Sequence, residues 1–147
     1  MKKIVIPTII LFALLLILLM FRARGNDETV FCCRDFLAGY GWQTETEPEG
    51  KYDVFIPEEF DVIYTNYNIL QKEAGLDLLP YRGMRGIRYS FVITNYPFKT
   101  GETVYADVLT VDGKPVAGDI MTVSIDGFMH SLIMPSLARL AQTVQRY

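Results

Sequence analysis

The chain has 147 residues, half of them apolar and 13% aromatic, a composition that excludes an intrinsically disordered protein. The first 24 residues hold four of the 14 basic side chains and none of the 17 acidic ones, which leaves 10 basic against 17 acidic residues, a net charge of −7. Because an acidic domain repels phosphate backbones and anionic headgroups, this balance excludes nucleic-acid binding and peripheral docking on anionic lipid.

The N-terminal segment is dominated by one uncharged apolar run, residues 4–21, with basic residues on both sides. As a helix, this run would be about 27 Å long, close to the hydrocarbon thickness of a bilayer. The run ends in Phe21-Arg22-Ala23-Arg24, a poor signal-peptidase site. We therefore predict an uncleaved transmembrane anchor over residues 1–24, with a cleaved signal peptide and a buried core helix as alternatives.

The orientation of this anchor depends on a small charge difference. Lys2, Lys3 and the terminal amine precede the run, and Arg22 and Arg24 come after it. The short N-terminal stub favours export of the domain on the C-terminal side of the run. We predict a single-pass protein of the cell membrane whose C-terminal domain is extracytoplasmic, and a domain facing the cytoplasm is the alternative.

The next segments predict a helix, a strand and a second helix. Gly25-Asn26-Asp27 is expected to end the span and cap a helix over residues 28–40. Residues 52–56 are typical of a short strand. A further helix is expected to open at Pro57 and to end at Gly75, since proline suits the first turn and glycine the C-terminal end.

The two cysteines, Cys32 and Cys33, are adjacent on the first of these helices. Neighbouring helical side chains point about 100° apart, which does not suit a disulfide. We expect free, partly buried thiols, with a reactive thiol or an intermolecular bridge as alternatives.

The second half of the chain alternates apolar and polar residues as strands do. Residues 87–94 predict a half-buried strand, and residues 103–111 and 115–125 predict a hairpin joined at Asp112-Gly113-Lys114. Residues 135–147 predict a C-terminal amphipathic helix. The fold class is therefore predicted as α+β: after the anchor, a two-layer domain over residues 25–134 with helices on one face of a mostly antiparallel sheet of about four strands.

His130, the only histidine, lies close in sequence to Ser124 and Asp126. Nucleophilic catalysis requires a hydroxyl, an imidazole and an orienting carboxylate. His130 and Asp126 are therefore weak catalytic candidates, and a structural histidine that closes a turn is the other interpretation.

No metal or cofactor site is predicted. One histidine and two adjacent cysteines do not supply a tetrahedral zinc site. The carboxylates Glu58, Glu59 and Asp61 lie at a predicted helix start, without the ligand loop that calcium requires.

Arg82, Arg85 and Arg88 recur at every third position beside Tyr81. In an extended segment such a row could bind a carboxylate or phosphate, or it could pair with the acidic residues of the domain itself. We treat these four residues as the candidate binding surface.

Several stretches are similar to one known family. They are residues 36–42 (FLAGYGW), 56–83 (IPEEFDVIYTNYNILQKEAGLDLLPYRG) and 90–97 (SFVITNYP), together with Gly118-Asp119-Ile120 and residues 126–130 (DGFMH). The chain thus resembles a domain-of-unknown-function family of small membrane-anchored proteins from clostridia and related Gram-positive bacteria. This resemblance implies a bacterial origin and a place in the cell envelope, and it implies no activity, ligand or catalytic residue.

Taken together, these features predict a non-enzymatic binding or accessory module of the bacterial envelope, whose partner is a protein, a peptide or a cell-wall component. A small hydrolase using His130 and Asp126 is one alternative. A signalling or sporulation accessory protein that faces the cytoplasm is the other.

Overall fold

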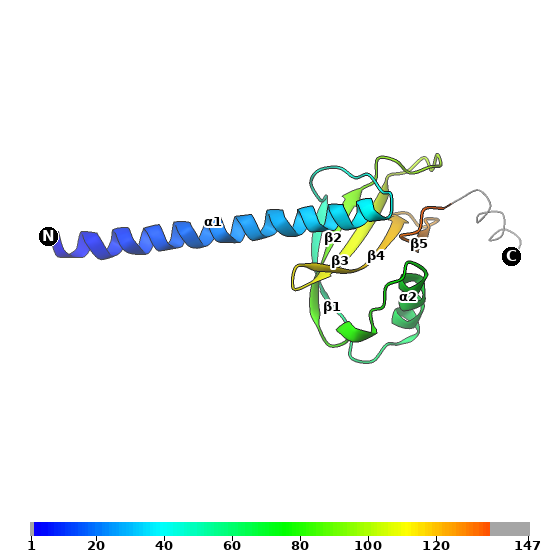
Figure 1. The fold of residues 1–147 in the computed structure, drawn as a ribbon, viewed down its shortest axis with the longest axis horizontal. Coiled ribbons are helices and arrows are strands. Elements are labelled where there is room, and N and C mark those ends of the chain that lie inside the picture. Colours follow the sequence, from blue (N-terminus) through cyan, green and yellow to red (C-terminus); the bar gives the residue numbers. More distant parts are fainter. Residues whose placement is uncertain (1, 136–147) are drawn as a thin grey trace, which may run out of the picture.

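The computed structural model describes residues 2–135, with side chains at residues 10–18 and 28–135. Figure 1 shows one long helix whose C-terminal part crosses a twisted sheet, with a second, shorter helix beside the sheet. The elements are α1 (Lys2–Gly39), β1 (Gly50–Phe55), α2 (Val62–Glu73), the 3₁₀ helix η1 (Leu79–Tyr81), β2 (Arg85–Val92), β3 (Val104–Val111), β4 (Lys114–Thr122) and β5 (Met129–Ser131). The predicted C-terminal helix, residues 135–147, lies almost wholly outside the described residues.

The sheet is an antiparallel meander of five strands in the order β1-β2-β3-β4-β5. Each strand pairs with its sequence neighbour, as short connections favour. The predicted count of about four strands missed β5, which has three residues and begins right after the turn at residues 124–127.

The N-terminal anchor predicted from the sequence is wrong. No helix in the described part of the chain is long and apolar enough to cross a membrane. α1 also runs without a break through Gly25-Asn26-Asp27, where the sequence predicted a stop. The predictions of a transmembrane helix and of a single-pass, extracytoplasmic protein are corrected accordingly.

The C-terminal part of α1 packs on one face of the sheet, here called the first face. Cys33 and Leu37 are buried there against Tyr89, Phe91 and Ile120. The chain that leaves α1 brings Trp42 into the same cluster, where its indole N–H donates to the carbonyl of Leu132 at 2.7 Å. This cluster attaches α1 to the strands.

α2 lies along the edge of β4 that the short β5 leaves open. Gln71 Oε1 accepts a hydrogen bond from the backbone N–H of Gly118 at 2.9 Å, so a side chain replaces the missing strand partner. From there α2 reaches the opposite face of the sheet, here called the second face, where the Tyr67 hydroxyl donates to Asp119. The predicted arrangement with all helices on one face is therefore wrong, because α1 packs on the first face and α2 covers an edge and part of the second.

α2 begins later than the sequence predicted. Its N-cap is Asp61, whose carboxylate accepts from the N–H of Tyr64 at 2.8 Å. The chain before it is fixed at Ile56, which bonds through its backbone to Gly83 and Met84, and it bends at residues 58–59 before the helix begins. The helix ends as predicted just before Gly75, which has a φ of 78°.

The β3–β4 hairpin turns at Asp112-Gly113, as predicted, with positive φ at both residues. The register shifts near the turn, between Leu109 and Thr110 of β3, because their partners on β4, Ala117 and Pro115, leave Val116 as the extra residue of a bulge. Beyond this bulge, each residue of β3 pairs with the β4 residue one position later than it would in a hairpin without a bulge. This shift places Asp107 directly opposite Asp119.

Gly86 lies beside this bulge on β2, and its replacement by alanine is expected to destabilise the fold by about 1–3 kcal/mol. A Cβ there would lie 2.5 Å from the carbonyl oxygen of Thr110, a backbone atom that cannot swing aside. Urea unfolding followed by circular dichroism measures the change. Gly39→Ala is the control, since a Cβ at Gly39 meets nothing within 4 Å among the described atoms. Equal stability of the two variants would contradict the close approach.

Candidate functional site

A row of polar side chains crosses the second face of the sheet. Ser90, Asp107, Asp119 and Ser131 lie directly opposite one another on four neighbouring strands, from β2 to β5. The two central carboxylates are almost fully buried, with exposed fractions of 4% for Asp107 and 2% for Asp119. Because opposing side chains on neighbouring strands have Cβ atoms about 4.5–5.5 Å apart, this is a buried pair of like charges, which destabilises a sheet.

The two carboxylates have unequal partners. Asp107 accepts a hydrogen bond from the Ser90 hydroxyl, and its Oδ2 lies 3.4 Å from Nε of Arg88. Asp119 accepts a bond at its Oδ1 from the hydroxyl of Tyr67, at 2.7 Å. The other oxygen of Asp119, Oδ2, is buried and has no hydrogen-bond partner among the described residues. Asp107 is thus the compensated member of the pair and Asp119 the uncompensated one.

The pKa of Asp119 is raised to about 7, first by burial and then by the charge of Asp107, against the lowering effects of the Tyr67 hydrogen bond and of Arg88. Burial also raises the pKa of Asp107, opposed by Ser90 and Arg88. The Tyr67 hydroxyl has its pKa raised well above 10, first by burial and then by Asp119, so it donates as a neutral phenol. Near neutral pH Asp119 therefore exchanges a proton, and its protonation relieves the repulsion between the two carboxylates.

An open groove of about 570 Å³ lies between α2 and the second face. Its lining is mostly apolar and aromatic, and comprises Val54, Ile63, Tyr64, Asn66, Tyr67, Leu70, Arg88, Leu109 and Met129. Two of these residues, Tyr67 and Arg88, are also the partners of Asp119 and Asp107. The carboxylate pair therefore lies directly behind the groove, and an apolar hollow with a few convergent polar groups is the usual form of a ligand site.

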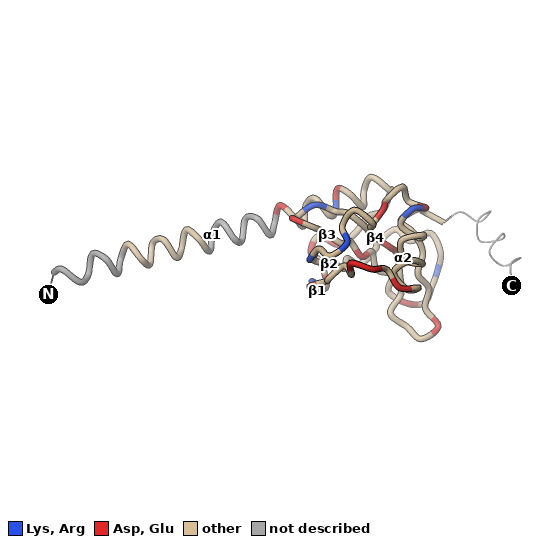
Figure 2. The backbone as a smooth tube through the Cα atoms, turned by 90° about the horizontal axis from the view of Figure 1, so that it is seen from below, with Lys and Arg blue, Asp and Glu red and all other residues tan. Residues whose placement is uncertain are grey.

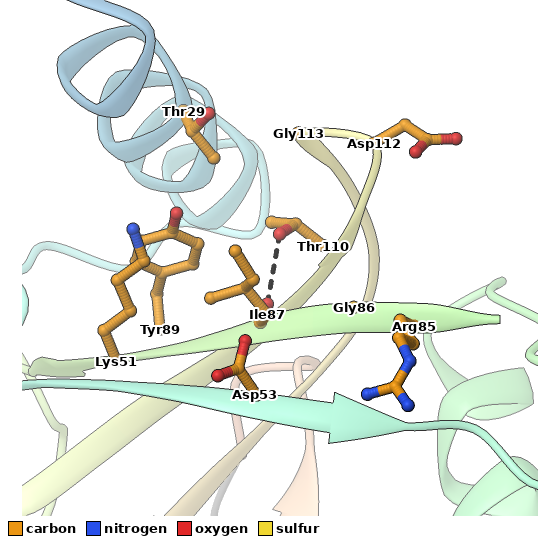
Figure 3. Close-up of a pocket in the computed structure, with 10 residues that line it drawn as sticks. All are labelled: Thr29, Lys51, Asp53, Arg85, Gly86, Ile87, Tyr89, Thr110, Asp112 and Gly113. Carbon is orange, nitrogen blue, oxygen red and sulfur yellow. Dashed lines mark hydrogen bonds between the residues drawn. The ribbon is translucent and has the colours of Figure 1, made fainter. Parts of the chain in front are cut away.

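A second hollow, of about 440 Å³, lies on the first face between α1 and the β1 side of the sheet (Figure 3). Thr29 of α1 and Asp53 of β1 border it, and Lys51 and Arg85 add positive charge beside it. The dashed line in Figure 3 joins Thr110 to the carbonyl of Ile87. The charged residues that line this hollow are solvent-exposed and of mixed sign, which is typical of a hydrated surface, so we consider the groove on the second face the stronger candidate.

The candidate arginine row does not form one surface. Arg85 and Arg88 are three positions apart on β2, so they project to opposite faces, Arg85 toward the hollow of Figure 3 and Arg88 into the groove. Arg82 donates through Nε to the carbonyl of Leu79. Tyr81 packs against the buried cluster around Ile56. Of these four residues, Arg88 alone is found among those that line the groove.

His130 lies on β5 in an aromatic cluster with Phe128, Tyr96 and Trp42. Its Nδ1 donates to the carbonyl of Ser131 at 2.7 Å, and its Nε2 lies 3.2 Å from the Tyr96 hydroxyl. Burial lowers the pKa of His130, against the raising effects of the Ser131 carbonyl and Glu73. Asp126 is exposed on the preceding turn. This geometry fits a neutral, structural imidazole.

Neither cysteine is bonded, as their adjacency predicted. Burial raises the pKa of the Cys33 thiol to about 12, and the neighbouring Cys32 adds to this, so Cys33 behaves as a small core residue. Within the described ranges, no three side chains of the His, Cys, Asp or Glu type come close enough to hold a metal ion.

A family model, the domain of unknown function DUF4830, matches residues 36–120, more than half of the chain. The chain belongs to the DUF4830 family. No curated protein and no solved structure matches it. The resemblance to a domain-of-unknown-function family is thereby confirmed, whereas a clostridial origin stays a prediction. The DUF4830 match takes in α2, β2, β3 and both carboxylates, and it ends before β5 and His130.

The sequence carries a signal for this site in the two aspartates themselves. Asp107 and Asp119 interrupt strands that are mostly apolar and mostly buried. A charged residue in such a strand is rarely buried without a partner or a role.

Proposed function

We propose that this DUF4830 domain is a non-enzymatic binding module, and that the groove between α2 and the second face accepts an aliphatic side chain of a peptide partner. The groove itself is the observation that supports the proposal most. It is large enough for a side chain with its flanking backbone, and its apolar lining faces solvent.

The exposure of the lining supports a bound partner. Ile63 is 70% exposed and Met129 51% exposed, although both are large apolar residues at the groove. The aromatic rings of Tyr64 and Tyr67 offer rigid contact surface, as in many recognition sites. Asn66, exposed at the same groove, can bond a peptide backbone through its side-chain amide.

The test uses a tripeptide of glycine, norleucine and glycine with blocked ends, titrated into the full chain and followed by backbone amide NMR shifts. We expect shifts confined to α2 and the second face. Ile63→Glu should weaken binding at least fivefold, because it places a charge in the apolar lining.

Ile69→Glu is the matched control, since Ile69 lies on the same helix, is 56% exposed and is not a groove residue. Binding equal to that of the unmodified chain supports the proposal. Shifts scattered over the surface, or equal weakening by both variants, would overturn it.

A further inference from the structure

The charges behind the groove do not balance. The titratable and charged groups that face Asp119 are Asp107 on β3, Arg88 on β2 and Tyr67 on α2, and Tyr67 is a neutral hydrogen-bond donor. Ser131 lies opposite Asp119 on β5 and carries no charge. With both carboxylates ionised, Arg88 supplies the one positive charge against two negative ones. The oxygen without a partner among the described residues is Oδ2 of Asp119, a buried atom on the second face, behind the groove residues Tyr67 and Arg88.

We propose that the side chain bound in the groove is a lysine, whose ammonium pairs with Oδ2 of Asp119 while its four-carbon stem lies along the apolar lining. This inference rests on the proposed function and names the ligand class of the same site. A lysine side chain matches both features of the site. Its long apolar stem suits the apolar lining, and its single compact positive charge with three donors suits the carboxylate oxygen that has no partner.

Arg88 leaves room for this cation. Its guanidinium stacks over the ring of Tyr52 at 4.9 Å, and its side chain is 43% exposed. Its guanidinium is thus held on the β1 side of Asp107, away from Asp119 on β4, while its Nε still pairs with Asp107. Tyr67 continues to hold Oδ1 of Asp119, so the incoming ammonium takes the opposite oxygen.

The charge of the whole domain favours the same class of partner. Figure 2 shows acidic residues spread over the strands and loops, with fewer basic ones among them. Beyond the first 24 residues, the chain has 17 acidic side chains and 10 basic ones, so its net charge is negative. Such a surface attracts a cationic segment over a distance and repels an anionic one.

Binding of an ammonium should release a proton. In the empty groove the raised pKa of Asp119, about 7, keeps it largely protonated at pH 6 and largely ionised at pH 8. Only the ionised form pairs with lysine, so the affinity for lysine should rise between these two pH values, whereas the affinity for a neutral side chain should stay constant.

The experiment compares the blocked tripeptide Gly-Lys-Gly with Gly-norleucine-Gly, which has the same four-carbon stem and lacks the ammonium, by NMR titration of the full chain. At pH 8 we expect the lysine peptide to bind about tenfold more tightly. At pH 6 the difference should fall to about twofold. Equal binding of the two peptides at pH 8 would overturn the lysine inference and leave the groove a binding site. If neither peptide shifts groove resonances, the proposed function itself falls.

Asp119→Asn separates a specific ion pair from general attraction. The variant keeps the shape and the acceptor for Tyr67, and it should bind both peptides equally at both pH values. The control is Asp126→Asn, which removes one exposed acidic charge outside the groove and should keep the preference for lysine. A preference that survives Asp119→Asn, or that disappears in Asp126→Asn, would contradict the assignment.

Discussion

Asp119→Asn is expected to make the domain more stable by about 2–4 kcal/mol at pH 8, and to have almost no effect at pH 4. The carboxyl of Asp119 is buried opposite Asp107 and has one hydrogen-bond donor for its two oxygens among the described residues. Asparagine has nearly the same shape, still accepts from Tyr67, and carries no charge. The variant therefore removes a buried charge without creating a cavity.

The sign of the pH dependence is set by the raised pKa. In the unfolded chain Asp119 ionises near its ordinary pKa of about 3.9, and in the folded domain near about 7. Between these values the folded state holds a proton that the unfolded state has lost. The free energy of unfolding therefore falls as the pH rises from about 4 to about 7, and it levels off above that.

Urea unfolding of both proteins at unit steps from pH 4 to pH 8 measures this effect. The unmodified chain should lose stability over the window, and the variant should show a flatter profile. Asp126→Asn, at an exposed turn position, should match the unmodified chain within about 0.5 kcal/mol. A parallel pH profile for Asp119→Asn would show that the carboxyl is not the group that titrates.

Trp42→Phe is expected to destabilise the domain by about 2–4 kcal/mol. Trp42 is buried in the cluster that attaches α1 to the first face, and its ring stacks on Tyr96 at 5.9 Å between centroids. Phenylalanine is smaller and has no N–H. The substitution would leave a cavity, and it would also remove the 2.7 Å hydrogen bond to the buried carbonyl of Leu132.

Thermal unfolding followed by circular dichroism measures the loss, because the substitution removes the single tryptophan that fluorescence would report. Phe31→Leu serves as the control. Phe31 is 66% exposed on α1, so its replacement should change stability by no more than about 0.5 kcal/mol. If the two variants unfold at the same temperature, Trp42 does not make the contact that ties α1 to the end of β5.

A carboxylate that lowers stability at neutral pH is a feature that binding sites often retain. Stability could be raised at Asp119 by a single substitution, whereas the proposed recognition of lysine depends on that charge. The two expected results for Asp119→Asn, greater stability and loss of the preference for lysine, can therefore be measured on one protein.

Local features of the chain were predicted well from the sequence. The hairpin turn at Asp112-Gly113 arises from the ease with which Asp and Gly adopt positive φ. The end of α2 before Gly75 and the free thiols of Cys32 and Cys33 also depend on residues next to one another. The helix and strand periodicities placed most elements within a few residues of their observed bounds.

The candidate site was not predicted, because its register depends on one bulge. Without the shift at Leu109 and Thr110, the hairpin would pair Asp107 with Gly118 and would place Asp119 on the other face. The predicted arginine row failed to converge for a related reason. A strand alternates its faces, so Arg85 and Arg88 cannot share one surface.

The sequence by itself determined the hairpin turn, the C-terminal end of α2, the chemistry of the cysteines and the family, since each depends on residues that are close along the chain. Only the tertiary structure decided that α1 continues onto the first face, that α2 closes the open edge of β4, and that two aspartates meet behind a groove. These outcomes depend on contacts between segments far apart in sequence, where the competition for buried surface and for backbone hydrogen bonds overrides local preference.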